Sequence, residues 1–481
     1  MARDQGHSLP VRFAAELLVL ALLAAAVASY RFDLGERWFG WGPVDPAAEP
    51  ALVLPPEGLR LPVSRPAPAV AKAGAHVDVD PAQVALAVNP LLRGKVLGPH
   101  YAVLVQDLAT GREVFRAGAS SIIPASTTKL LTSVAALETL GPTTRFATTV
   151  RWSPQSRRLT LVGGGDPFLV RTPASGQGLY PQRADLTTLA RRTAAALEAD
   201  GVSRVRLSFD DHLFSGPEVN PTWPAAYLDD VTSPISALWV DEARADSGYG
   251  FVADPAAGAG TFFARALRQA GVTVVGSPSD AAAPAGAREV AAVRSATVGE
   301  IVERTLAVSD NQAAEVLARH VGVATGGQGS FAGGAAAVLD TVRELGVPVD
   351  GDRLLDGSGL SRSNRLSADT LAGVLRLSES ARRPELRQVL TGLPVAGFTG
   401  SLQYRFDAGP AQALGRVRAK TGTLMGVHGL AGVADDPSGA RMAFVVVADR
   451  VDAAVDLDAR VRVDRIAAAL GACRCGVGSP S

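Results

Sequence analysis

Alternating or continuous apolar positions predict strands in two separate parts of the chain. Residues 101–107 (YAVLVQD) and 113–116 (EVFR) flank the turn-forming sequence ATGR, a pattern typical of a β-hairpin. Residues 429–433 and 442–447 are apolar over lengths that suit strands. The pattern therefore predicts four strands, two near each end of the folded region.

Apolar residues at helical spacing predict three helices. The first follows the polar stretch 124–129 and has apolar residues at positions 130, 131, 134 and 137. The other two cover residues 297–307 and 312–321. Polar motifs precede the first helix and separate the other two, so side chains suited to chemistry lie at helix ends.

The region between these helices has a pattern of its own. Short strand-like runs at 159–162 and 205–209 are separated by turns rich in glycine and proline. We expect an α+β multidomain protein in which a β-rich insertion of one or more domains interrupts the main body. The predicted parts are a discontinuous main domain, residues 76–150 and 290–472, an insertion, residues 151–289, and a tail, residues 473–481.

The N-terminus predicts export. Arg3 and Arg12 precede an apolar run from 17 to 28, which ends in the small-x-small sequence AVA. Extended to residues 13–30, the run is long enough for a membrane anchor, although Glu16 lies inside it. Residues 1–30 are predicted to be a signal peptide or a signal anchor. Residues 31–75, rich in proline and alanine, are predicted to be a linker. We expect the protein to be extracytoplasmic, in the cell envelope, either secreted or membrane-anchored.

Charge and cysteine content exclude some functions. The 47 acidic residues balance the 47 basic residues, so bulk charge suggests no nucleic-acid partner. Cys473 and Cys475 are separated by one residue, which makes a mutual disulfide geometrically awkward. No second cysteine pair completes a zinc site. We expect these cysteines to be incidental and the protein to use neither a metal nor a cofactor.

The sequence Ser126-Thr-Thr-Lys129 is a candidate catalytic motif. Residues three apart share a helical face, so the hydroxyl and the amine would point into one space. Alone, the motif equally describes a helix-capping serine and a surface lysine. The use of lysine favours chemistry, because the chain has arginine almost everywhere and lysine only at positions 72, 95, 129 and 420. Arginine cannot replace a lysine that must lose its proton.

Two further motifs follow. Ser309-Asp-Asn311 lies between two predicted helices and offers a hydroxyl and an amide, although such a sequence is usually a helix cap. Lys420-Thr421-Gly422-Thr423 reads as a strand that presents a cation and hydroxyls, with the glycine allowing a substrate backbone to lie close. Taken alone, Lys420 is equally consistent with a solvated charge on an edge strand.

The three motifs together, in this order, are the S-x-x-K, S-x-N and K-T-G set of penicillin-binding proteins and serine β-lactamases. The chain resembles the D-alanyl-D-alanine carboxypeptidase/endopeptidase family, the class C low-molecular-mass penicillin-binding proteins, over residues 85–470. Further stretches that resemble family signatures are LVGGGDP (161–167), DDHLFSG (210–216), SALWVDE (236–242), DGSGLSRSNR (356–365) and GFTGSL (397–402).

The resemblance implies a β-lactamase/transpeptidase-like domain, an antiparallel sheet flanked by helices with a helical subdomain, and a serine D,D-peptidase. Ser126 would form an acyl-enzyme, with Lys129 as the base. Ser309 and Asn311 would relay the proton to the leaving amine and hold the substrate amide. The implied substrates are peptidoglycan stem peptides, and β-lactam antibiotics would acylate the same serine.

The resemblance also implies substrate-binding groups. Lys420, Thr421 and Thr423 would bind the terminal carboxylate, and the N–H groups of Ser126 and Thr423 would form the oxyanion hole. Asp166 and Arg362 would read a diaminopimelate side chain, which ends in an ammonium and a carboxylate. The alternative for these two residues is structural: a turn before Pro167 and a braced loop.

Two other functions remain open on the sequence. A serine β-lactamase would share these residues but hydrolyse its acyl-enzyme quickly. A non-catalytic wall-binding module would not need every catalytic group. A Ser-His-Asp hydrolase is excluded because the chain has no G-x-S-x-G sequence.

Overall fold

The structure is a computed structural model that describes residues 76–477. The predicted signal segment, residues 1–30, and linker, residues 31–75, lie outside the described residues. No helix in the described part of the chain has the length and apolar character needed to cross a membrane.

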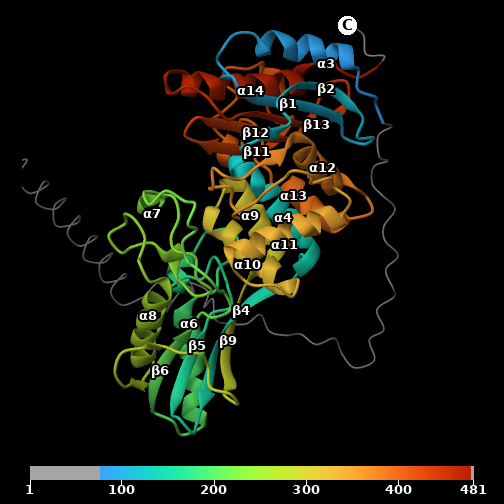
Figure 1. The fold of residues 1–481 in the computed structure, drawn as a ribbon. Coiled ribbons are helices and arrows are strands. Elements are labelled where there is room, and N and C mark those ends of the chain that lie inside the picture. Colours follow the sequence, from blue (N-terminus) through green and yellow to red (C-terminus); the bar gives the residue numbers. More distant parts are fainter. Residues whose placement is uncertain (1–75, 478–481) are drawn as a thin grey trace, which may run out of the picture. The chain divides into compact units, whose positions relative to one another are not determined.

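A five-stranded antiparallel sheet joins the two ends of the described chain (Figure 1). Its order is β11-β12-β13-β1-β2, and β1 pairs with β13 so that Tyr101 lies opposite Ala448. The predicted hairpin and the two predicted C-terminal strands are all present in this sheet. Its strands are β1 (Tyr101–Asp107), β2 (Glu113–Gly118), β11 (Val417–Leu424), β12 (Val427–Asp435) and β13 (Arg441–Ala448).

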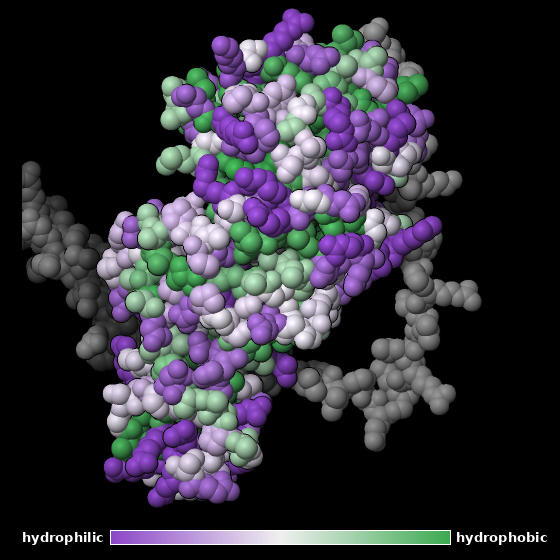
Figure 2. Space-filling model, in the orientation of Figure 1, coloured by the Kyte–Doolittle hydropathy of each residue, from purple (hydrophilic) through white to green (hydrophobic). Residues whose placement is uncertain are grey.

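Helices cover both faces of this sheet, because its strands are apolar on both sides and seven of the eight residues of β13 are buried. One face packs against α3 (Pro81–Val88) and α14 (Asp456–Ala472), and the other packs against α12 (Ala368–Glu379). The surface in view in Figure 2 is a mixture of hydrophilic and hydrophobic residues, whereas the apolar residues of the strands are buried.

A layer of helices packs against α12. The helix α10 packs on α4 and α11, and α9 packs on α4 and α13. Local sequence sets where these helices begin: Thr297 and Glu300 form a capping box at α9, and the Asp310 carboxylate caps α10. The bounds are α4 (Lys129–Leu140), α9 (Val298–Val308), α10 (Asn311–Ala324), α11 (Phe331–Glu344) and α13 (Arg387–Thr391).

A second sheet forms between α4 and α9 in the sequence. Its order is β7-β6-β5-β4-β9, and β8 also pairs with β6. The strands that lead into and out of this region, β4 and β9, are antiparallel neighbours. Its strands are β4 (Arg145–Ser153), β5 (Arg158–Val162), β6 (Arg204–Asp210), β7 (Thr273–Val274), β8 (Ser279–Asp280) and β9 (Arg288–Thr297).

The inserted region holds more helix than the sequence analysis predicted. The helices α6 (Leu186–Ala199) and α8 (Pro255–Gln269) pack on each other and on one face of the second sheet. Each buries an apolar stripe, for example Leu189 in α6 and Phe263 in α8. Because β5, β6 and β7 are parallel, their connections must cross over the sheet, and helices make that crossover.

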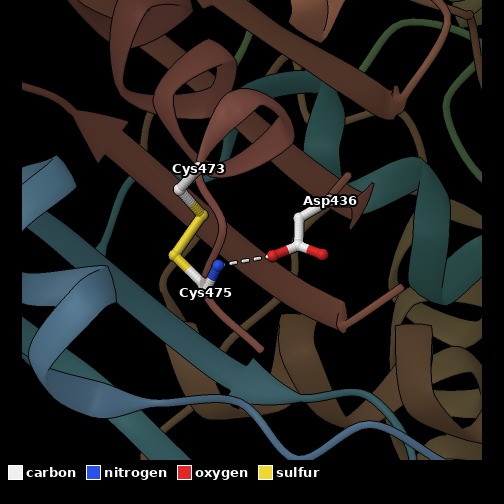
Figure 3. A group of neighbouring side chains, drawn as sticks. All are labelled: Asp436, Cys473 and Cys475. Carbon is white, nitrogen blue, oxygen red and sulfur yellow. Dashed lines mark hydrogen bonds between the residues drawn. A yellow bond between two sulfur atoms is a disulfide. The ribbon is translucent and has the colours of Figure 1, made fainter. Parts of the chain in front are cut away.

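The expectation for the two cysteines was wrong. Cys473 and Cys475 form a disulfide, with their Cα atoms 5.4 Å apart (Figure 3). The chain leaves α14 at Cys473 in an extended conformation, so the two Cβ atoms can face each other. The Cys475 N–H donates to Asp436, 2.6 Å away, and the Asp80 N–H donates to the Cys475 carbonyl, also 2.6 Å away. The backbone of Cys475 thus links the end of the described chain to its beginning.

Candidate active site

The motif Ser126-Thr-Thr-Lys129 lies at the junction of a 3-10 turn, Ala125–Thr128, and the helix α4. Ala125 has a φ of 46°, in the left-handed region that costs a non-glycine residue about 1–2 kcal/mol. A Cβ at Gly359 would lie 1.9 Å from the Ala125 carbonyl oxygen. The backbone around Gly359 therefore packs directly against the turn that presents Ser126.

Lys129 is fully buried and connects three parts of the site. Its Nζ lies 2.9 Å from the Ser126 Oγ, 2.8 Å from the Asn311 Oδ1 and 2.7 Å from the Ser358 carbonyl oxygen. Burial lowers the pKa of Lys129 to about 8, because the charged form loses its hydration, and nearby carboxylates, Glu315 first, oppose the shift. A substantial fraction of this amine is thus neutral near pH 8 and able to accept the proton of Ser126.

Two buried carboxylates, which the sequence analysis did not single out, hold the loop beside Lys129. Glu315 accepts the N–H groups of Gly357 and Ser358 at 3.0 and 2.7 Å. Burial raises the pKa of Glu315 to about 7. Its position four residues after Asn311, on the same face of α10, was the available signal in the sequence.

The second carboxylate, Asp356, shapes the same loop from inside. It accepts the backbone N–H groups of Gly359 and Ser361 at 2.9 and 2.6 Å. It also accepts the indole N–H of Trp223 at 2.8 Å, which ties the loop to the inserted region. These bonds fix the Ser358 carbonyl that accepts from Lys129.

The S-x-N motif links α9 to α10. Ser309 has a φ of 64° and ends α9, while Asn311 is the first residue of α10. The Asn311 amide faces two ways: its Oδ1 accepts from Lys129, and its Nδ2 donates to the Val231 carbonyl, 3.2 Å away, in the inserted region. The inserted region therefore helps to orient a residue of the catalytic motif.

The K-T-G motif lies in β11. Lys420 has no exposed surface, and its Nζ donates to the Thr421 carbonyl at 3.0 Å and to the Thr421 Oγ1 at 3.4 Å. No carboxylate forms an ion pair with Lys420 among residues 76–477. Burial, with the charges of Lys129 and Arg405, lowers the pKa of Lys420 well below its ordinary value. An incoming anion would therefore stabilise the charged form of this amine.

Only part of the outer edge of β11 forms backbone hydrogen bonds with a neighbouring segment. The Ala396 N–H donates to the Val417 carbonyl, and the Ala419 N–H donates to the Pro394 carbonyl. Because backbone groups of alternate residues face the same edge, those of residues 421 and 423 face the side beyond this contact. The Ser401 Oγ lies 3.0 Å from the Thr421 Oγ1 where the contact ends.

Gly422 has a different role from the one expected. A Cβ at this position would lie 2.8 Å from the Pro124 carbonyl oxygen and 3.2 Å from the Thr127 Cγ2. Gly422 is also absent from the residues that line the pocket beside Ser126. The glycine therefore allows β11 to approach the turn that carries Ser126, and the expectation that it faces the substrate is corrected.

A pocket of about 770 Å³ opens beside Ser126. Motif residues and Arg362 share its wall with apolar residues of the inserted region, which the sequence analysis missed because no motif marks them. The Arg362 guanidinium donates to the Met425 carbonyl at 2.8 Å. The lining residues are Ser126, Pro224, Ala226, Tyr227, Val231, Ser309, Asn311, Leu360, Arg362, Thr421, Thr423, Leu424 and Met425.

Asp166 does not overhang this pocket, contrary to its expected position. It is 5% exposed, does not line the pocket, and accepts the Phe168 N–H at 2.9 Å. Burial raises the pKa of Asp166 to about 7. Its contacts match the turn before Pro167 that was the structural alternative.

Possible metal-binding groups lie outside the pocket. Among the described residues, clusters of histidine, cysteine and carboxylate side chains occur at Asp436 with Cys473 and Cys475, at His76 with Asp78 and Asp107, and at Asp211 with His212 and Asp280. In the first cluster the disulfide uses both sulfur atoms.

Comparisons with known proteins agree with this site. Residues 84–249 and 244–470 match the model of the D-Ala-D-Ala carboxypeptidase 3 (S13) family. The chain is 34% identical over 468 residues to carboxypeptidase DacB of Mycolicibacterium smegmatis, covering 95% of this chain and 96% of that protein. It is 32% identical over 458 residues to the D-alanyl-D-alanine carboxypeptidase of Actinomadura sp., covering 77% and 80%.

A solved structure shares the fold. Penicillin binding protein 4 (dacB) from Haemophilus influenzae superposes with a TM-score of 0.65 at 21% identity, covering 81% of this chain and 98% of that chain. This likeness confirms the predicted α+β, transpeptidase-like fold class. The fold and the site define a penicillin-binding, serine-type D-Ala-D-Ala carboxypeptidase. The chain belongs to the D-Ala-D-Ala carboxypeptidase 3 (S13) family, which confirms the resemblance seen in its motifs.

Proposed function

We propose that the chain cleaves D-Ala-D-Ala ends of peptidoglycan stem peptides, and D-Ala–diaminopimelate cross-links, through an acyl-enzyme on Ser126. The observation that carries this assignment is the position of Lys129, whose Nζ contacts both the Ser126 hydroxyl and the Asn311 amide at the pocket wall. A hydroxyl next to a buried amine of lowered pKa is the arrangement that activates a serine.

Acylation proceeds in balanced steps. The Ser126 Oγ attacks the carbonyl carbon of the penultimate D-alanine, and its proton passes to neutral Lys129. The N–H groups of Ser126 and Thr423 hold the oxyanion, and each such donor is worth about 3–4 kcal/mol. The C–N bond then breaks, the leaving amine takes a proton relayed through Ser309, and the acyl group stays on Ser126.

Deacylation reverses the proton path. Water attacks the ester carbonyl, Lys129 accepts the proton of the water, and Ser126 leaves as the hydroxyl. During acylation, Lys420 with Thr421 and Thr423 holds the carboxylate of the leaving residue. The absence of an anionic partner for Lys420 among the described residues supports this role, since a buried cation is stabilised by an opposite charge.

Arg362 is proposed to contact the acidic end of the stem-peptide side chain. It lines the pocket, and a guanidinium matches a carboxylate in geometry and charge. Asp166 was expected to bind the ammonium of the same side chain, but its burial away from the pocket gives this pairing no support.

We propose further that the enzyme works outside the cytoplasm, where peptidoglycan is assembled. Residues 13–30 would hold it at the membrane, or a signal within residues 1–30 would be removed on export. The apolar run in this segment supports both routes. Sequencing the N-terminus of the protein recovered from the cell envelope separates them.

The activity is tested with a soluble acyl-D-Ala-D-Ala peptide. We expect stoichiometric release of D-alanine by the wild-type protein and none by the Ser126→Ala variant. A β-lactamase would instead turn over penicillin rapidly with little action on the peptide, and a wall-binding module would do neither.

A further inference from the structure

The sheet of the inserted region has one face without helices. Along β4, β5 and β6, side chains alternate between the two faces. Apolar residues such as Val150, Leu159 and Leu207 point to the side that packs with α6 and α8. The residues between them point to the opposite side. These include Arg151, Arg158, Arg204 and Arg206, which we call the arginine face.

The arginine face has no anionic partner in the part of the chain that the structure describes. Three of its residues are exposed and Arg158 is half-buried, yet none forms an ion pair or a side-chain hydrogen bond with any of residues 76–477. Some arginines of similar exposure elsewhere are paired. Arg441, for example, contacts both Glu379 and Asp435. The four charges are therefore available to a ligand.

The register of the strands places like charges together. Arg158 lies directly opposite Arg206 in the parallel pair β5–β6, and adjacent strands are about 4.8 Å apart. Like charges opposite each other in a sheet are destabilising. Glu289 lies opposite Arg151 in β9, but the two side chains form no ion pair in the described structure. An external anion between Arg158 and Arg206 would relieve this repulsion.

The residues between the arginines are polar, buried and already hydrogen-bonded. Thr160 and Ser208 are neighbours in the same register, and their hydroxyl oxygens lie 2.9 Å apart. Both are fully buried, so they do not compete for a ligand. The free hydrogen-bonding groups of this face are therefore the guanidinium groups, whose planar fork matches a carboxylate with two parallel bonds.

We propose that the arginine face binds carboxylates of neighbouring stem peptides in the peptidoglycan that the active site cleaves. This inference rests on the proposed function, because it takes the substrate to be a polymer whose side branches repeat free carboxylates. Charge complementarity selects this occupant. A second contact on the same polymer raises the local concentration of cleavable ends at the pocket without altering the chemistry there.

The test compares two double variants of the full chain. Arg158→Gln/Arg206→Gln removes two charges from the arginine face. Arg191→Gln/Arg265→Gln removes two exposed charges from α6 and α8 on the other side of the same sheet. Binding is measured at low salt by co-sedimentation with insoluble peptidoglycan, before and after attached phosphodiester polymers are stripped from it. It is measured again after amidation of the carboxyl groups of the stripped material.

We expect the first variant to bind stripped peptidoglycan at least about 5-fold more weakly than wild type, and the control variant to bind normally. Amidation should remove the difference. Both variants should keep the wild-type kcat/KM on a soluble acyl-D-Ala-D-Ala peptide. If the wild-type protein itself does not cleave this peptide, the result contradicts the proposed function and not the binding role of the arginine face.

Three results would overturn the inference. The first is equal binding by wild type and the arginine-face variant. The second is an equal loss in the control variant, which would show a general charge effect. The third is a loss seen only before the phosphodiester polymers are stripped, which would make those polymers the ligand.

Discussion

The Nζ atom of Lys129 lies 2.9 Å from the Oγ atom of Ser126, and this amine has no exposed surface. Burial favours the neutral amine, and the contact places it where the serine proton must go. The activity of the protein is therefore expected to depend on the protonation state of one lysine.

Replacing Lys129 tests this dependence. Lys129→Arg keeps a positive charge that does not titrate, and Lys129→Met keeps the length of the side chain without a base. Both variants should acylate with penicillin at least about 100-fold more slowly than wild type. Thermal unfolding of each variant checks that the fold survives. A rate for Lys129→Arg near that of wild type would remove Lys129 from the role of base.

The pH dependence follows from the lowered pKa of Lys129. Only the neutral amine accepts a proton, so kcat/KM for a soluble peptide should rise about tenfold per pH unit below an inflection near pH 8 and level off above it. Glu315→Gln removes a negative charge that favours protonated Lys129, so the inflection should move to lower pH. An inflection unchanged in this variant would show that another group sets the profile.

Ser401 is expected to position Thr421. The Thr421 Oγ1 accepts from Lys420, 3.4 Å away, and if it also accepts from Ser401, its own proton is left for the substrate carboxylate. Ser401→Ala should raise KM about 3- to 10-fold with kcat little changed. Ser401→Thr, which keeps the hydroxyl, should restore KM. A fall in kcat at constant KM would contradict this role.

Asp166→Asn should affect all substrates alike, because Asp166 lies away from the pocket. A larger loss on diaminopimelate-bearing peptides than on a neutral acyl-D-Ala-D-Ala mimic would restore the substrate contact first expected.

The Asp166→Asn variant should also change the stability of the protein. The pKa of Asp166 is raised to about 7, so its stabilising effect is lost as pH rises toward 7. Wild type should therefore lose stability relative to the variant between pH 4 and 8, measured by chemical denaturation.

The sequence predicted the parts of the site that depend on local order. Helical spacing brought Ser126 and Lys129 together, and the K-T-G motif was correctly read as part of a strand. The sequence analysis missed Glu315 because this residue acts by binding the backbone of the loop at Gly357, and only the tertiary fold brings that loop to α10. The spacing of Glu315 from Asn311 places it on the same face of α10, but it does not identify the distant backbone N–H groups that Glu315 binds.

Two further differences have local causes. The spacing of Cys473 and Cys475 does not predict the backbone conformation after α14. That conformation decides whether the two sulfur atoms come within bonding distance. The glycine of the K-T-G motif was assigned to the substrate because its neighbours are. Its actual constraint is the Pro124 carbonyl, contributed by a segment almost 300 residues earlier in the chain.

The central claim is that Ser126 is the nucleophile of a penicillin-sensitive peptidase. Intact-mass measurement after addition of penicillin, followed over time and combined with peptide mapping, tests it most directly. We expect one penicilloyl group per chain, mapped to Ser126, that persists for minutes or longer and is absent in Ser126→Ala. An adduct on another residue, or complete turnover of penicillin within seconds, would contradict the account.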